Sequence, residues 1–274
     1  MTPTTDLDLL PHHAETVAAL TRQMAADPAV LGLVLGGSIA HGFATAASDV
    51  DVVIVVAPDE LARLSAADRL HYNATDVVTY EGGYVDGKYM DVPGLRLVAE
   101  RGSDPARYGF VGARVLFSRV PGLEDVLARI TRYPEEDRAS RIERFTAQLL
   151  GWRWYHSQGV EKGDPYLTTA ALAKVVLFSA RLVLAENSLL YPHHKWLLRV
   201  TEGAPRSPAG LVDRLRVFSA DPAAATVADV AAHVSGLIAF YGGDEEAANA
   251  VWPTHFIRDS ESAWVTGQAP IDEM

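Results

Sequence analysis

The residues best suited to chemistry are two aspartates, Asp49 and Asp51, at the start of an apolar run that continues to Val56. Side chains two positions apart on a strand point to the same face, so we expect the two carboxylates to lie side by side. They would repel each other and lose solvation there, and a divalent cation relieves both costs. Magnesium favours carboxylates combined with phosphate oxygens. The pair therefore predicts a Mg²⁺ site that also holds a phosphate-bearing substrate.

A second feature, Gly37-Ser38, directly follows a β-rich run over residues 30–35. Glycine lets the backbone approach a ligand closely, and the N–H groups of a tight turn attract an anion. A helix that begins at Ser38 or Ile39 would add its positive end to the same place. We therefore expect Gly37 and Ser38 to bind phosphate.

A third carboxylate, Asp91, lies in another strand-like stretch, residues 88–92. A neighbouring strand could bring it beside Asp49 and Asp51. Three acids around one or two cations can bridge phosphates, and they can lower the pKa of an attacking hydroxyl or accept its proton. Asp91 is therefore predicted to complete the metal site and to take part in catalysis.

Each feature also has a purely structural interpretation. Gly-Gly-Ser often forms only a turn, and Asp-x-Asp often ends a strand in solvent. Asp91 lies two positions before Pro93 and could simply cap a helix that begins there. The features occur here in one order, with ten residues between Ser38 and Asp49. This combination is much less common than its parts, and it favours the catalytic interpretation.

The elements that must position these residues change in character near Tyr133. Residues 1–132 alternate strand-like and helix-like segments, and residues 133–274 are almost wholly helix-like. Strands are expected at 30–35, 50–56, 76–80, 88–92 and 114–118, with a glycine-bearing turn at 81–87. Helices are expected at 13–27, 58–72, 135–157, 166–186 and 227–241. The prediction is an α/β domain over 1–132 and an all-α domain over 133–274.

Composition limits the function classes. The chain has 274 residues, a formal net charge of -11 and no cysteine, which excludes disulfides and thiolate metal sites. The acidic excess is spread over both halves, which disfavours general nucleic-acid binding. The first residues lack the basic start and apolar run of a secretory signal, and charges interrupt the long apolar stretches. We expect a cytoplasmic protein without a membrane-spanning segment.

In these residues the sequence resembles the DNA polymerase beta-type nucleotidyltransferase superfamily. That superfamily carries Gly-Ser, a spacer of about this length, Asp-x-Asp and a third acid on a later strand. The matching positions are Gly37, Ser38, Asp49, Asp51 and Asp91. The resemblance implies a mixed sheet flanked by helices, and transfer of a nucleoside monophosphate to a hydroxyl with release of pyrophosphate. The Gly-Ser pair would hold the β- and γ-phosphates, and the three aspartates would hold magnesium.

Residues 179–196 are similar to the helical domain of aminoglycoside adenylyltransferases, which implies a helical bundle that completes the site. In those enzymes an arginine and a downstream lysine of this domain reach the triphosphate, and the matching positions are Arg181 and Lys195. Lys174 lies nearly two helical turns before Arg181 and can share its face. Ser48, next to the acid pair, could also reach a phosphate. Together these residues would bind the nucleotide and offset charge in the transition state.

The third acid departs from the aminoglycoside-modifying pattern, in which a glutamate is common. The shorter Asp91 changes the reach to an acceptor hydroxyl. Glu81 and Glu143 are therefore the reserve candidates for the general base.

We therefore expect an enzyme that uses Mg²⁺ and transfers AMP from ATP to a hydroxyl of a small acceptor such as an aminoglycoside, as in antibiotic resistance. An acidic surface would steer a polycationic acceptor. Two alternatives stay open. One is nucleotidyl transfer to tRNA or protein, as in toxin-type relatives, and the other is a non-catalytic nucleotide sensor. The sequence also leaves open the choice of triphosphate and whether the protein is a homodimer.

Overall fold

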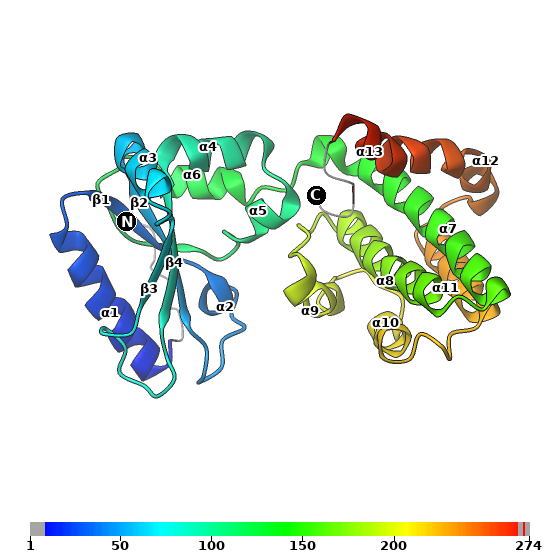
Figure 1. Cartoon of the computed structure of the whole chain (residues 1–274), viewed down its shortest axis with the longest axis horizontal. Coiled ribbons are helices and arrows are strands. Elements are labelled where there is room, and N and C mark those ends of the chain that lie inside the picture. Colours follow the sequence, from blue (N-terminus) through cyan, green and yellow to red (C-terminus); the bar gives the residue numbers. More distant parts are fainter. Residues whose placement is uncertain (1–8, 268–270, 272–274) are drawn as a thin grey trace. The chain divides into compact units, whose positions relative to one another are not determined.

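The computed structural model describes residues 9–267 and residue 271. The chain divides into two compact units, Met1–Arg132 and Tyr133–Met274 (Figure 1). The first unit holds all five strands that the described residues form, and the second is helical. Each unit has hydrophobic core residues of its own.

A five-stranded mixed sheet is the centre of the first unit, with the strand order β3-β4-β2-β1-β5. Strands β2 and β4 pair in parallel, and the other neighbours pair antiparallel. The strands are β1 (Val30–Leu35), β2 (Val50–Val56), β3 (His71–Ala74), β4 (Val85–Asp91) and β5 (Arg114–Ser118). The mixed sheet confirms the fold class that the resemblance implied.

Helices cover both faces of this sheet. They are α1 (Pro11–Ala26), α2 (Gly37–Ala40), α3 (Pro58–Ala66), α4 (Val92–Arg101), α5 (Asp104–Tyr108) and α6 (Leu123–Ile130). Leu20 of α1 shares one core cluster with Ile54, whereas Leu95 of α4 and Leu123 of α6 share the other with Val53. Strand β2 is therefore apolar on both faces, as expected for a central strand.

Strands β3 and β4, at one edge of the sheet, differ from the strand prediction. The third strand lies at His71–Ala74 rather than at 76–80, and β4 begins at Val85, within the expected turn. Gly87 lies inside β4, where a Cβ atom would approach the Val52 Cγ2 atom to 3.0 Å and the Tyr72 Cβ atom to 3.3 Å. This glycine allows close packing beside the strand and does not form a turn.

The second unit is built around two long helices, α7 (Arg138–Lys162) and α8 (Pro165–Glu186). The remaining helical elements are η1 (Glu135–Asp137), η2 (His194–Trp196), α9 (Leu197–Glu202), α10 (Leu211–Ala220), α11 (Val227–Phe240), α12 (Glu245–Phe256), η3 (Ile257–Glu261) and α13 (Ser262–Thr266). By length and composition α8 could cross a membrane, but 67% of its most apolar window is buried inside the structure. It is the core helix of this unit, which explains its hydropathy.

One buried polar pair lies in that core. His233 of α11 is 5% exposed, and its Nε2 atom lies 2.8 Å from the Ser179 hydroxyl of α8. Burial of the imidazole, with a smaller contribution from the charge of Arg214, lowers the pKa of His233 to about 4. Protonated His233 therefore fits the folded unit poorly.

The stability of the helical unit should fall as the pH falls from about 6.5 to about 4. In this window the unfolded chain takes up a proton that folded His233 does not, so His233 contributes a loss on the order of 3 kcal/mol. All five tryptophans of the chain lie in residues 133–274, so urea unfolding followed by tryptophan fluorescence reports on this unit. Its free energy of unfolding should decrease between pH 7 and pH 4.5.

The substitution His233→Gln should reduce this pH dependence, whereas His193→Gln, at an exposed position, should leave it unchanged. Part of the dependence should persist in His233→Gln, because burial also lowers the pKa of His156. Equal pH dependence in His233→Gln and wild type would contradict the assignment.

Candidate nucleotide and metal site

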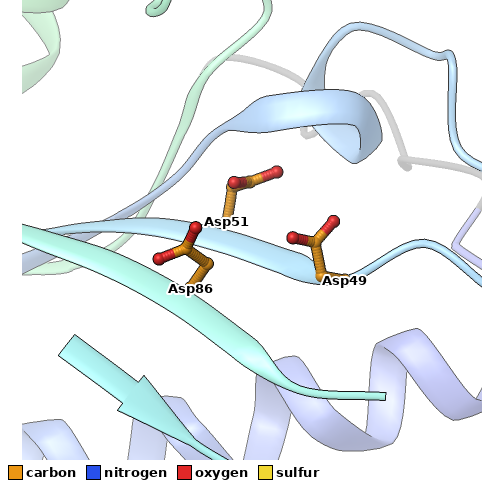
Figure 2. A group of neighbouring side chains, drawn as sticks. All are labelled: Asp49, Asp51 and Asp86. Atoms are coloured by element: carbon orange, nitrogen blue, oxygen red, sulfur yellow. The ribbon is translucent and has the colours of Figure 1, made fainter. Parts of the chain in front are cut away.

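Three carboxylates meet on one face of the sheet, where β2 and β4 begin. Asp49 directly precedes β2, and Asp51 lies opposite Asp86 in the parallel pairing of β2 with β4. One oxygen atom of each carboxylate lies within 4.8 Å of the others. Figure 2 shows the three side chains on the same side of the strands. We name Asp49, Asp51 and Asp86 the three-acid cluster, and its oxygen ligands suit a hard divalent cation.

Asp91, expected as the third acid, is not part of this cluster. It ends β4 opposite Val56, five positions beyond Asp86, and an odd separation along a strand leads to the other face. Its Oδ1 atom accepts a hydrogen bond of 2.8 Å from the backbone N–H of Gly94 and so caps α4. Asp91 therefore caps α4 from the other face of the strand, and Asp86 is the acid that lies beside Asp49 and Asp51.

The expected turn at Gly37 packs directly against the cluster. The backbone N–H of Gly36 donates a 2.9 Å hydrogen bond to the carbonyl of Asp51, which ties the turn to β2. Gly37 has φ +61°, and a Cβ atom there would overlap the Asp51 carboxylate. Only glycine leaves room for this carboxylate and adopts the left-handed backbone without strain.

Ser38 is buried at the start of α2, and its Oγ atom has no hydrogen-bond partner among the residues that the structure describes. A buried hydroxyl without a partner costs free energy, so such groups are uncommon unless a ligand or water completes them. Ser48 differs, because its Oγ atom accepts a 2.9 Å hydrogen bond from the backbone N–H of Thr45 and closes a turn.

Two further side chains contact the carboxylates of the cluster. The Nε2 atom of His71, on the neighbouring strand β3, lies 2.7 Å from Asp86 Oδ1. Tyr84 hydrogen-bonds Asp49, and this bond together with the Asp49 charge raises the pKa of the Tyr84 hydroxyl. Both contacts restrict how the two carboxylates can rotate.

Sequence reasoning missed Asp86, His71 and Lys88. Lys88 follows Asp86 by two positions on the same strand and is exposed, with its Nζ atom 5.7 Å from the Phe110 ring centroid. It brings a cation to the face that carries the acids. The available signal was the segment Val85-Asp86-Gly87-Lys88, which alternates small or apolar residues with charged ones.

Neither reserve base, Glu81 or Glu143, is a member of the three-acid cluster. Glu81 is exposed in the turn before β4. Glu143 lies on α7 of the helical unit, with its Oε1 atom 3.3 Å from His255 Nδ1. Within the residues that the structure describes, the three-acid cluster is the only group of three or more acidic or histidine side chains close enough to share a metal ion.

The three cations expected from the helical unit lie in different environments. Arg181 is 4% exposed, its guanidinium lies 4.4 Å and 4.6 Å from the Phe145 and Tyr191 ring centroids, and its Nη1 atom donates to the carbonyl of Ile271. Arg181 therefore belongs to the core of its unit. Lys195 is exposed in η2 beside Trp196, and Lys174 lines a cavity of about 290 Å³.

This site has the features of a known family. A family model described as a nucleotidyltransferase domain matches residues 19–155, which include the whole sheet, the Gly37-Ser38 turn and the three-acid cluster. The chain belongs to the nucleotidyltransferase domain family. The membership confirms the superfamily that the sequence resembled. It also makes the protein a transferase that uses a nucleotide, with an acidic cluster suited to a divalent metal.

Among solved structures, this nucleotidyltransferase is similar to a nucleotidyltransferase-like protein from Exiguobacterium sibiricum. The two are 12% identical with a TM-score of 0.45, and the match covers 89% of this chain and 79% of that chain. No curated protein matches the chain.

The substitution Gly37→Ala should weaken divalent-cation binding, because the new methyl group would displace the Asp51 carboxylate. Gly42→Ala is the matched control: Gly42 also has a positive φ of +71°, but a Cβ atom there has nothing within 4 Å. Both substitutions should cost about 1–2 kcal/mol of stability through backbone strain. Only Gly37→Ala should also lower Mn²⁺ affinity, measured by electron paramagnetic resonance, and equal affinities in the two variants would refute this role of Gly37.

Proposed function

We propose that this nucleotidyltransferase transfers AMP from ATP to a hydroxyl of a small acceptor, with Mg²⁺ as the cofactor. The observation that carries the proposal is the three-acid cluster beside the Gly37 turn. Carboxylate oxygens are ligands that Mg²⁺ accepts together with the phosphate oxygens of a nucleotide. Mg²⁺ would supply charge neutralisation at the phosphates.

Each residue of the site has a proposed role. Asp49 and Asp51 hold the cation, Asp86 completes the cluster, and Gly37 with Ser38 holds the β- and γ-phosphates. The oxygen of the acceptor attacks the α-phosphorus, and the bond from this phosphorus to the pyrophosphate oxygen breaks. The proton of the acceptor hydroxyl passes to Asp86, which takes the role of general base that was first expected for Asp91.

The chemistry of the phosphate-binding residues supports a nucleotide at this site. A bound phosphate could supply a partner for the Ser38 hydroxyl, which has none among the described residues. Lys88 offers a positive charge on the acid-bearing face, which suits a polyphosphate. Ser48 is a weaker candidate, because its hydroxyl oxygen already accepts the Thr45 N–H.

Positively charged side chains of the helical unit are further candidates for binding the nucleotide. Lys174 and Lys195 remain the candidates for contact with the triphosphate. Arg181 is proposed here to stabilise its own unit, because its guanidinium is buried between two aromatic rings. A net charge of -11 suits a polycationic acceptor such as an aminoglycoside, and on this basis we propose a small-molecule acceptor. We also propose that the enzyme is cytoplasmic.

Asp49→Asn, Asp51→Asn and Asp86→Asn should each abolish ATP-dependent pyrophosphate release, because each removes a negative charge from the cation site. We expect losses of at least a hundredfold in kcat. Asp91→Asn is the matched control, because asparagine also caps helices and the residue lies outside the cluster. The proposal predicts wild-type pyrophosphate release in Asp91→Asn, and activity that survives in all three cluster variants would disprove it.

The class of acceptor can be tested with ATP labelled on the α-phosphate. The protein is incubated with this ATP, Mg²⁺ and either an aminoglycoside panel or a cell lysate. An enzyme that modifies small molecules should transfer the label to an aminoglycoside or to another acceptor of low mass. Label in tRNA or protein would favour the macromolecular alternative, and nucleotide binding without any transfer would favour the sensor.

A further inference from the structure

The loop of residues 45–48, which leads into Asp49, is held by side chains that are distant in sequence. The Nε2 atom of His13 lies 3.0 Å from the Ser48 carbonyl oxygen, and the Tyr80 hydroxyl lies 2.7 Å from the same oxygen. The Nε2 atom of His12 lies 3.1 Å from the Ala46 carbonyl oxygen. Because a carbonyl oxygen only accepts, all three side chains are donors here.

These three donors form a packed group, which we name the loop clamp: His12, His13 and Tyr80. Ring centroids are 4.2 Å apart between the histidines, 4.5 Å between His12 and Tyr80, and 5.3 Å between His13 and Tyr80. His13 is 1% exposed. The clamp joins the start of α1 to the segment before β4, and the loop rests on both.

The clamp acts one peptide bond away from the cation site. The Ser48 carbonyl belongs to the rigid, planar peptide that ends in the nitrogen of Asp49. Two donors on its oxygen fix the plane of this peptide, and therefore the direction in which Asp49 leaves the loop. Beyond Asp49, the backbone N–H of Val50 donates a 3.1 Å hydrogen bond to the Tyr84 carbonyl, and the Tyr84 hydroxyl bonds the Asp49 carboxylate.

We propose that His13 and Tyr80 are positioning residues for Asp49, which hold its carboxylate ready for the cation before the cation binds. The proposal rests on the proposed function, because it assigns the clamp to the metal site. Loops are mobile by default, and Asp49 is the member of the cluster that lies outside a strand. A site ordered in advance avoids the entropy cost of ordering the loop when the ligand binds.

The substitution Tyr80→Phe tests the proposal because it removes one donor and keeps the ring. Thr79→Val is the matched control, because the Thr79 hydroxyl donates its 3.1 Å hydrogen bond to Glu15 of α1 and not to the loop. Mn²⁺ affinity is measured by electron paramagnetic resonance, and hydrogen exchange of the 45–50 amides reports the order of the loop. Tyr80→Phe should weaken Mn²⁺ binding about fivefold and speed exchange, and Thr79→Val should do neither.

A second pair of variants separates positioning from packing at His13. The amide of His13→Gln can still donate to the Ser48 carbonyl, whereas His13→Leu cannot. Mn²⁺ affinity should be close to wild type in the first variant and lowered in the second, at pH 7.5 and with folding checked by thermal unfolding. In steady-state assays, the variants with lower Mn²⁺ affinity should also have a lower kcat.

Two results would overturn these ideas in different ways. Wild-type Mn²⁺ affinity in folded Tyr80→Phe and His13→Leu would make the clamp purely structural and would refute positioning, even if exchange is faster. A wild-type protein that binds neither Mn²⁺ nor ATP would instead refute the proposed function. Lower Mn²⁺ affinity in both variants, with Thr79→Val unchanged, would support the positioning role.

Discussion

Repulsion among three carboxylates is the constraint on which the first unit depends. Charges within 4.8 Å of one another oppose folding unless the backbone forces them together. The parallel pairing of β2 with β4 holds two of the acids together, because it places Asp51 opposite Asp86 along a fully paired strand. Val53 and Val55 continue the same face into a buried core. The burial of this apolar surface stabilises a register that the acids alone would not favour.

Two glycines make this register sterically possible. Gly37 leaves the space that the Asp51 carboxylate fills, and Gly87 lets β4 approach the Val52 and Tyr72 side chains on the opposite face. One glycine lies in a turn and the other inside a strand, so the same residue type serves two geometries. In both cases the missing Cβ atom determines how closely the backbone packs.

The sequence predicted what depends on local pattern and missed what depends on distant pairing. Asp49, Asp51 and Gly37 lie close together as predicted, because their spacing along one strand–turn–strand segment sets their geometry. Asp86 was missed because Gly82, Gly83 and Gly87 together suggested a turn, although Gly87 lies in β4. Asp91 was assigned to the site because it also lies in a strand-like run. The parity of the strand, and Pro93 after it, indicate a helix cap instead.

The same distinction applies to side chains that support the site without being ligands. His71 contacts Asp86 across β3 and β4, and His13 and Tyr80 reach Ser48 over 35 and 32 positions of sequence. No local spacing encodes these contacts, because each depends on how helices and loops pack on the finished sheet. Arg181 adds a further example: its position matches a phosphate-binding pattern in the sequence, and in the structure its guanidinium is buried beside the Phe145 and Tyr191 rings. A motif therefore locates candidate charges, whereas the surroundings of each charge depend on packing that the motif does not encode.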